Sequence, residues 1–349
     1  MIGFRVDANE HIATGHMYRC LAIAEQLRKK NEECIFLTAS DSDLEPCVKE
    51  NFEVIKLDLR SDDWNYGIDA LKGCFLKNGV SLLLVDSYKV TPLFFDELWG
   101  VIPVFYMDDL CQIAYNVSGV LHYSEWEDEE LIAGLYKGKN TAVYSGLKYM
   151  PLRSGFDLHG KHDRYDILIT TGGSDSCHMT ERLLSEIIVS ESCNDKSICA
   201  VLGKMNKDEE RIRGLCEGHS NITVLKNICN MNEIMSESAF ALTAGGITVY
   251  ELMASGVPFA CFSFSDDQRI FGEKIEKHGY CGYAGDARKD ANSVTLKLLG
   301  LMHDYSLLPE GKKDALIKNN RMAVDGKGAD RIADVLIEME SKRLFWDAK

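Results

Sequence analysis

The sequence predicts an α/β protein made of two doubly wound, Rossmann-like domains, each with a parallel sheet. The chain has 349 residues, enough for two domains at roughly 150 residues each, and 46% of them are hydrophobic. Short β-branched runs alternate with segments of helical period, which is typical of βα units whose sheets are buried on both faces. The alternation restarts after Leu147–Asp163, a stretch with Pro, Gly and mixed charge that we interpret as the linker.

The first domain is expected to span residues 1–154. Its expected strands are Ile2–Val6, Cys34–Leu37, Val54–Leu57, Ser81–Val85, Val101–Met107 and Gly119–Leu121. Its expected helices are Gly15–Lys30, Trp64–Asn78 and Pro92–Trp99. Apolar residues recur in these helical segments every three or four positions, which predicts that one face of each packs on the sheet.

The second domain is expected to span residues 155–327. Its expected strands are Tyr165–Thr170, Ser197–Leu202, Asn221–Leu225, Phe240–Thr243 and Pro258–Phe262. Its expected helices are Cys177–Val189, Lys207–Glu217, Asn230–Ser236, Thr248–Ser255, Gln268–Lys277, Asn292–Asp304 and Pro309–Asn319. A final helix at Gly328–Phe345, within the segment 328–349, is expected to return to the first domain. The carboxyl ends of both sheets should line a cleft, where such sheets bind ligands.

Charge and composition exclude several classes of function. The net charge is -15, which disfavours nucleic acid as a partner because tracking phosphates needs a basic surface. We find no signal peptide and no apolar run long enough for a membrane span, so we expect a cytoplasmic protein. None of the 12 cysteines forms a C-x-x-C pair, and most lie in apolar runs, as reduced thiols do. No metal, no cofactor and no obligatory protein partner is inferred.

The first candidate site is the stretch "VDANEHIATGHMYRC", between the first strand and the first helix. Gly15 permits a tight turn, and the free N–H groups of the first helical turn attract anions. His16 would lie at the positive end of the helix dipole, which disfavours a protonated imidazole and leaves a neutral general base. A His that only caps the turn is the alternative.

The second candidate is "LTAGGITVYELMASGVPF", a strand followed by Gly245-Gly246 and then a helix. Such a turn, with Ile247 and Thr248 opening the helix, holds a diphosphate on its backbone N–H groups. Glu251, one turn into the helix, is placed to accept hydrogen bonds from a ribose diol. The alternative is an ordinary tight βα turn with a solvated Glu251.

Further candidates follow other strands. Gly172, Gly173 and Ser174 in "TTGGSD" form a second glycine turn, in which Ser174 contacts a phosphate or, as the alternative, caps a helix with Asp175 and Ser176. Tyr88, in "DSYKV" with Asp86 and Ser87, is placed to orient a His or a water. Asp108 and Asp109 are either loop caps or a metal site, and Asp267 and Gln268 are candidate contacts to sugar hydroxyls.

These motifs, with "DGKGADRIADVL" near the end, resemble in order the UDP-sugar hydrolase family of pseudaminic acid biosynthesis. That family is related to the N-acetylglucosaminyl transferase of peptidoglycan synthesis and has the glycosyltransferase B fold. The resemblance implies cleavage of UDP-2,4-diacetamido-2,4,6-trideoxy-β-L-altropyranose to UDP and free sugar, with water and no metal. Gly15-His16 is its most specific element, whereas "AGGITVYE" is shared with the transferases.

The resemblance also implies roles for single residues. His16 matches the family's catalytic His, and Tyr88 matches an active-site Tyr. Gly245, Gly246 and Glu251 match its uridine diphosphate site. The chain departs from the family at Asp267-Gln268, where members often have Asn-Gln. A carboxylate accepts hydrogen bonds but donates none, so the contact to the sugar is expected to differ.

Three functions remain open from the sequence. A hydrolase needs one base to activate water and a cradle for the leaving diphosphate. A UDP-sugar-dependent glycosyltransferase would use the same nucleotide site and would also need an acceptor surface. A non-catalytic sugar-nucleotide binding module would keep the glycine turns and lose nothing if His16 were replaced.

Overall fold

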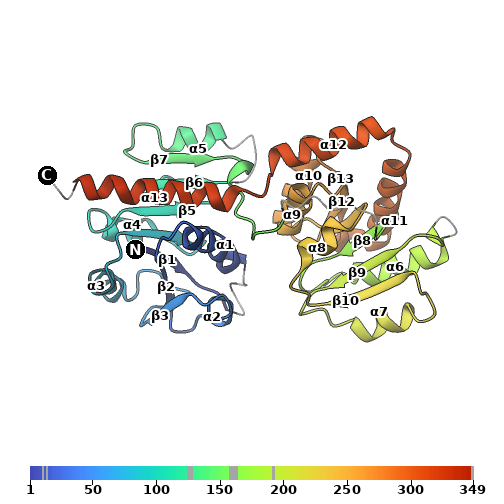
Figure 1. Ribbon diagram of the computed structural model, residues 1–349, viewed down its shortest axis with the longest axis horizontal. Coiled ribbons are helices and arrows are strands. Elements are labelled where there is room, and N and C mark those ends of the chain that lie inside the picture. The colour runs from blue at the N-terminus through green and yellow to red at the C-terminus, as the bar shows by residue number, and fades with distance from the viewer. Residues whose placement is uncertain (10–11, 13–14, 124–128, 157–163, 191–192, 347–349) are drawn as a thin grey trace. The chain divides into compact units, whose positions relative to one another are not determined.

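The computed structural model describes residues 1–9, 12, 15–123, 129–156, 164–190 and 193–346 (Figure 1). The chain divides into two compact units (Figure 1). Unit 1 consists of Met1–Ser154 and Lys327–Lys349, and unit 2 is Gly155–Gly326. The chain therefore leaves unit 1 after Ser154 and comes back to it for its last helix. The last seven residues of the stretch expected to act as the linker, 157–163, lie outside the described residues.

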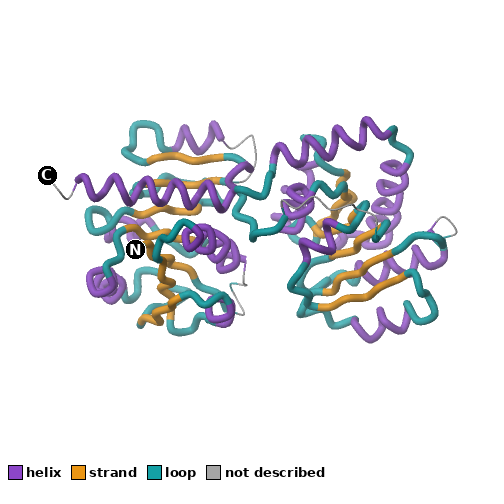
Figure 2. Tube along the Cα trace, in the orientation of Figure 1, coloured by secondary structure: helices purple, strands orange, loops and turns teal. Residues whose placement is uncertain are grey.

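Unit 1 contains a parallel seven-stranded sheet in the order β3-β2-β1-β4-β5-β6-β7. The strands are β1 (Ile2–Val6), β2 (Cys34–Ala39), β3 (Glu53–Leu57), β4 (Leu82–Asp86), β5 (Val104–Met107), β6 (Gly119–His122) and β7 (Ala142–Ser145). The helices are α1 (Gly15–Lys29), α2 (Glu45–Lys49), α3 (Ile68–Asn78), α4 (Pro92–Leu98), α5 (Glu129–Leu135), the 3₁₀ helix η2 (Leu147–Tyr149) and α13 (Gly328–Trp346). Figure 2 shows helices on both sides of these strands, as the doubly wound prediction requires.

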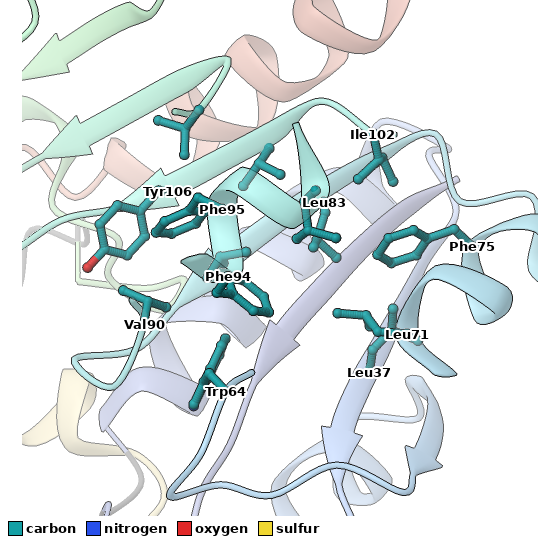
Figure 3. Packing of buried hydrophobic residues seen from close by; sticks show 14 of the residues in the cluster. Leu37, Trp64, Leu71, Phe75, Leu83, Val90, Phe94, Phe95, Ile102 and Tyr106 are labelled. Carbon is teal, nitrogen blue, oxygen red and sulfur yellow. The ribbon is translucent and has the colours of Figure 1, made fainter. Parts of the chain in front are cut away.

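The core of unit 1 forms because β4 and β5 are apolar on both faces and α4 places aromatic rings on one of them. Figure 3 shows Phe94 and Phe95 of α4 beside Tyr106 of β5, with the rings of Phe95 and Tyr106 4.9 Å apart. Trp64 packs edge-on against Phe94 at 5.3 Å. Thr91 fixes the start of α4, since its hydroxyl accepts a hydrogen bond from the N–H of Phe94.

Helix α13 belongs to unit 1 although it ends the chain. It packs against α1, β4 and η2. Glu340 of α13 forms an ion pair with the amino group of Met1 at 2.9 Å. Lys30, just after α1, forms ion pairs with Asp330 and Asp334 of α13. The terminal helix therefore closes one face of the first sheet.

Unit 2 contains a parallel six-stranded sheet in the order β10-β9-β8-β11-β12-β13. The strands are β8 (Ile167–Thr170), β9 (Ile198–Leu202), β10 (Ile222–Lys226), β11 (Ala241–Ala244), β12 (Phe259–Ser263) and β13 (Gly282–Asp286). The helices are α6 (Met179–Val189), α7 (Glu209–Leu215), α8 (Met231–Ser236), α9 (Ile247–Ser255), α10 (Asp266–Lys277), α11 (Ala287–Ser306) and α12 (Glu310–Ala323). The predicted fold class, two parallel-sheet Rossmann-like units, is confirmed.

Several elements differ from the sequence prediction. Strands β7 and β13 and helices α2 and α5 were not expected, because β13 reads "GYAGD", a turn-like sequence, and the others are short. The helix expected from Trp64 begins at Ile68, because Gly67 has φ of 75° and interrupts it. The helix expected from Cys177 begins at Met179, because His178 is in the left-handed region.

All 12 cysteines are free thiols, and eight of them are buried. Burial raises the pKa of Cys34, Cys47 and Cys199 to about 12, so these thiols stay protonated and pack as small hydrophobic groups. None of the described helices combines the length and the apolar character that crossing a membrane requires.

Candidate functional site

The strand order of the first sheet reverses between β1 and β4, which pair directly. From β1 the chain builds outward through β2 and β3, and from β4 it builds the other way through β5, β6 and β7. Ligands of open parallel sheets bind beyond the carboxyl ends of the strands at such a reversal. The connection after β1 leads to Gly15 and His16 in the first turn of α1, and β4 ends at Asp86, two residues before Tyr88.

His16 is held by a buried carboxylate. Its Nδ1 atom lies 2.7 Å from Oδ1 of Asp86, and the Asp86 side chain is fully buried. Arg19 Nη2 also lies 2.8 Å from Nδ1 and donates to the same Asp86 oxygen. An ionised Asp86 can only accept hydrogen bonds. The His16 proton therefore belongs on Nδ1, because otherwise the Nδ1 lone pair would face the carboxylate oxygen. The Nε2 lone pair of His16 is then available to accept a proton.

Asp86 is ionised because of Arg19. Burial by itself opposes ionisation, but the guanidinium of Arg19 and the imidazole of His16 outweigh it and hold the pKa of the Asp86 carboxyl well below its usual range. Arg19 makes two hydrogen bonds to this carboxylate, from Nε to Oδ2 and from Nη2 to Oδ1, each 2.5 Å long. Burial disfavours the charged guanidinium in turn, yet Asp109 and Asp86 raise its pKa well above the usual value.

Tyr88 lies against His16. Their ring centroids are 4.5 Å apart and the planes are nearly perpendicular, at 79°. The Tyr88 hydroxyl donates a hydrogen bond of 2.9 Å to Oδ2 of Asp109. Tyr88 is about half exposed, yet its partial burial and the Asp109 carboxylate both raise its pKa, so the phenol stays protonated and acts as a donor. The structure thus brings the two sequence-predicted residues of unit 1 together.

Asp108 and Asp109, the acidic pair after β5, have different roles. Oδ1 of Asp108 accepts hydrogen bonds from the N–H groups of Leu110 and Cys111, which is the loop cap that the sequence offered as one alternative. Burial raises the pKa of this carboxyl. Asp109 instead accepts from Arg19, Tyr88 and Tyr123. Across the described ranges, no group of three or more His, Cys, Asp or Glu side chains could hold a metal ion.

Sequence reasoning missed Arg19 and gave Asp86 no role beyond its place at a strand end. The spacing His16-x-x-Arg19 was the available signal, because residues three apart share a helix face. Nothing local to Asp86 or Asp109 identifies their partners, which are 70 and 90 residues away in the chain respectively. Only the parallel packing of β1, β4 and β5 brings them to α1.

In unit 2 the strand order reverses between β8 and β11, and a glycine turn follows each strand. Gly245 and Gly246 connect β11 to α9, and none of the described side chains caps that helix. Among the residues that the structure describes, no acceptor is found for the N–H groups of Ile247 and Thr248. These groups and the helix dipole are suited to an anion. Glu251 lies one turn further along α9 and is half-buried.

Gln268 lies beside this turn. The pair Asp267-Gln268 is in the first turn of α10, which begins at Asp266 and not at Gln268 as expected, because Ser265 caps the helix by accepting from the Gln268 N–H. Gln268 Oε1 accepts from the N–H of Phe264 at 3.1 Å. Its Nε2 lies 4.0 Å from the position that a Cβ atom on Gly246 would occupy. The Gln268 amide therefore has a donor near the glycine turn, whereas Asp267 is exposed.

The turn after β8 carries the other glycines. Gly172 has φ of 85°, and the carbonyl oxygens of Gly172 and Gly173 lie 2.4 Å from the position that a Cβ on Gly203 would take. Only glycine fits at residue 203, so the turn and the end of β9 are packed closely. Asp175 accepts from the N–H groups at the start of α6. Ser174 is therefore not the helix cap, and it is exposed.

Comparison with known proteins agrees with this architecture. Residues 167–325 match the glycosyltransferase family 28 C-terminal domain, which lies within unit 2. MurG of Acinetobacter baumannii superposes with a TM-score of 0.68 at 15% identity, covering 97% of this chain and 99% of that one. The Arabidopsis thaliana glycosyltransferase UGT89C1 complexed with UDP superposes with a TM-score of 0.64 at 14% identity, covering 96% and 99%. The fold is the glycosyltransferase B fold.

Three curated relatives align with the sequence. An uncharacterized protein of Methanocaldococcus jannaschii is 29% identical over 77% of this chain and 56% of its own length. The spore coat polysaccharide biosynthesis protein SpsG of Bacillus subtilis is 25% identical over 60% and 62%. The UDP-2,4-diacetamido-2,4,6-trideoxy-β-L-altropyranose hydrolase of Campylobacter jejuni is 25% identical over 79% and 96%. The chain thus spans about three-fifths of the length of the first two relatives.

Proposed function

We propose that this chain hydrolyses a UDP-2,4-diacetamido-2,4,6-trideoxyhexose to UDP and free sugar, without a metal, in nonulosonic (pseudaminic) acid biosynthesis. The observation that carries the proposal is the His16–Asp86 pair, which provides a base with its Nε2 lone pair available at the ligand-binding edge of the first sheet. The similarity to the Campylobacter jejuni hydrolase, which extends over 96% of that protein, supports the same substrate.

In the proposed reaction, water attacks the anomeric carbon and His16 Nε2 takes its proton. A bond forms between the water oxygen and this carbon, while the bond from the carbon to the phosphate oxygen breaks and its electron pair leaves with UDP. Asp86 then stabilises the imidazolium, as the carboxylate of a Ser-His-Asp triad does. UDP needs no strong general acid, because the last pKa of such a phosphate is about 6. Tyr88 contributes a phenol donor beside the imidazole.

The nucleotide is assigned to unit 2. The N–H groups of Ile247 and Thr248 and the Nε2 atom of Gln268 would donate hydrogen bonds to the diphosphate. Glu251 would accept from the ribose diol. Gly172, Gly173, Gly245 and Gly246 keep Cβ atoms away from the backbone that the diphosphate approaches. Ser174 and Asp267, both exposed, are assigned to the phosphate and the sugar hydroxyls respectively.

A UDP-sugar-dependent glycosyltransferase is the second candidate. It is favoured by the match of residues 167–325 to the glycosyltransferase family 28 C-terminal domain. The two functions differ in what attacks the anomeric carbon, an acceptor hydroxyl or water, and they share fold and nucleotide site.

Incubation of the purified protein with UDP-2,4-diacetamido-2,4,6-trideoxy-β-L-altropyranose in ¹⁸O-water, without any acceptor, tests the proposal. We expect UDP release at a catalytic rate and ¹⁸O in the anomeric hydroxyl of the sugar. UDP-N-acetylglucosamine is the matched control and should react far more slowly. No release of UDP would reject the hydrolase, and ¹⁸O in the phosphate would reject attack at carbon.

A further inference from the structure

Arg19 lies between two carboxylates that come from different strands. Its Nε and Nη2 atoms donate to Asp86, at the end of β4, and its Nη1 donates to Oδ2 of Asp109, after β5, at 2.6 Å. The Arg19 side chain is about 6% exposed. Nη1 also contacts the hydroxyl of Tyr123. The guanidinium thus joins two loops at the carboxyl edge of the sheet through buried, charge-assisted hydrogen bonds.

Each of these carboxylates holds one of the two residues assigned to the reaction. Asp86 accepts from His16 Nδ1, and Asp109 accepts from the Tyr88 hydroxyl. His16 and Tyr88 also touch each other through their rings. Arg19, Asp86, His16, Tyr88 and Asp109 therefore form a closed network of contacts, or circuit. Among the described residues, only Arg19 binds both carboxylates.

We propose that Arg19 is a positioning residue, which fixes His16 and Tyr88 in one joint arrangement through Asp86 and Asp109. The inference rests on the proposed function for its kinetic consequences, but the geometry that it predicts is measurable without turnover. Arg19 touches no reacting atom in this scheme. Its effect is to hold the imidazole in the Nδ1-protonated tautomer and the phenol beside it.

Only arginine can do this at position 19. A planar guanidinium presents donors in two directions at fixed angles, whereas a lysine ammonium is a single point that cannot bind both carboxylates in the same plane. The charges also match the chemistry, because two carboxylates and one guanidinium leave a local charge of about -1. When His16 takes a proton during the reaction, the local charge becomes about zero.

A second buried ion pair in the same unit provides a matched control. Arg5, in β1, donates to Asp7 at 2.7 Å, and both side chains are almost fully buried. Neither residue has a contact to His16 or Tyr88 among the described residues. Arg5→Lys therefore measures the general effect on unit 1 of replacing a buried, ion-paired arginine by lysine, and it leaves the circuit intact.

The experiment compares Arg19→Lys with Arg5→Lys by kinetics and by ¹⁵N NMR of His16. For Arg19→Lys we expect kcat to fall about 30-fold or more, KM to change by less than about threefold, and the Nδ1-protonated signal of His16 to be lost or mixed with the other tautomer. Arg5→Lys should keep kcat within about twofold and leave the His16 signal unchanged. Arg19→Lys with wild-type kcat and an unchanged His16 signal would overturn the proposal, as would an equal loss of kcat in both variants.

Coupling between the two residues gives a second test. Tyr88→Phe should lower kcat about tenfold in the wild type and less than about twofold in Arg19→Lys, because the phenol is no longer held there. Additive effects would contradict a joint arrangement. If Arg19→Lys does not fold, Asp109→Asn replaces it in the same cycle, since it weakens one arm of the circuit and leaves the Asp86 arm in place. Wild-type protein that keeps the predicted His16 tautomer but releases no UDP would reject the proposed function and leave this geometry standing.

Discussion

The two sheets reverse their strand order at corresponding places, yet the groups found there differ in kind. In unit 1 the reversal between β1 and β4 carries buried charged side chains, with Arg19 between Asp86 and Asp109. In unit 2 the reversal between β8 and β11 carries glycine turns and the first N–H groups of α9, for which the described residues provide no acceptor. The same topology therefore supports two kinds of chemistry, one based on a paired imidazole and one on backbone dipoles.

The difference makes a net charge of -15 compatible with the proposed diphosphate ligand. Backbone N–H groups attract a diphosphate without any lysine or arginine. The arginine at the other reversal forms ion pairs with two carboxylates of unit 1. Overall charge excludes long polyanions but does not exclude one diphosphate.

The largest expected effect is on the free energy of unfolding, and it tests whether the buried charges of unit 1 also stabilise the fold of that unit. Asp86→Asn removes a buried partner of Arg19 and should lower the free energy of unfolding by about 3 kcal/mol at pH 7, measured by urea denaturation. Because the folded pKa of Asp86 lies below its unfolded value of about 3.9, this contribution is present above about pH 4 and is lost as the pH falls further.

The difference between wild type and Asp86→Asn should therefore shrink below about pH 4. Asp166→Asn, in unit 2, is the control, because that carboxylate is 40% exposed and pairs with an exposed lysine, so its loss should cost less than about 1 kcal/mol. A difference for Asp86→Asn that is as large at pH 2 as at pH 7 would contradict the assigned ionisation.

The next effect separates chemistry from nucleotide binding. His16→Ala should lower kcat about 100-fold while the affinity for UDP, measured by calorimetry, stays within about twofold of wild type. His178 of unit 2 makes the same kind of contact, with Nδ1 2.5 Å from Asp208, and His178→Ala should keep kcat. Equal kcat in His16→Ala and wild type would remove His16 from the mechanism.

The smallest effect concerns unit 2 alone. Gln268→Glu keeps an oxygen to accept from the N–H of Phe264 but replaces the Nε2 donor by a negative charge. UDP affinity should fall about tenfold, which corresponds to about 1.4 kcal/mol, while kcat at saturating substrate stays the same. Asp267→Asn, at the neighbouring exposed position, should change UDP affinity by less than about twofold. A larger effect of Asp267→Asn than of Gln268→Glu would place the diphosphate elsewhere.

The sequence was sufficient for features that depend on local pattern. Hydrophobic periodicity predicted most strands and helices, and glycines after strands identified the turns at Gly172 and Gly245. It was insufficient where the local signal was weak or misleading, as for β13, which reads "GYAGD" and becomes a strand only because it pairs with β12. The start of α3 was wrong by four residues, because Gly67 has a positive φ and lies so close to the Asp58 carbonyl that a Cβ atom there would clash.

By itself the sequence determined that the chain forms two parallel α/β units and that His16 follows the first strand. Only the tertiary structure decided what His16 can do, because its partner Asp86 lies 70 residues away and reaches it when β1 pairs with β4. The same holds for Arg19 and Asp109, which meet across 90 residues. The type of a side chain is known from the sequence, but which of its atoms carries a proton depends on the neighbours that the fold brings to it.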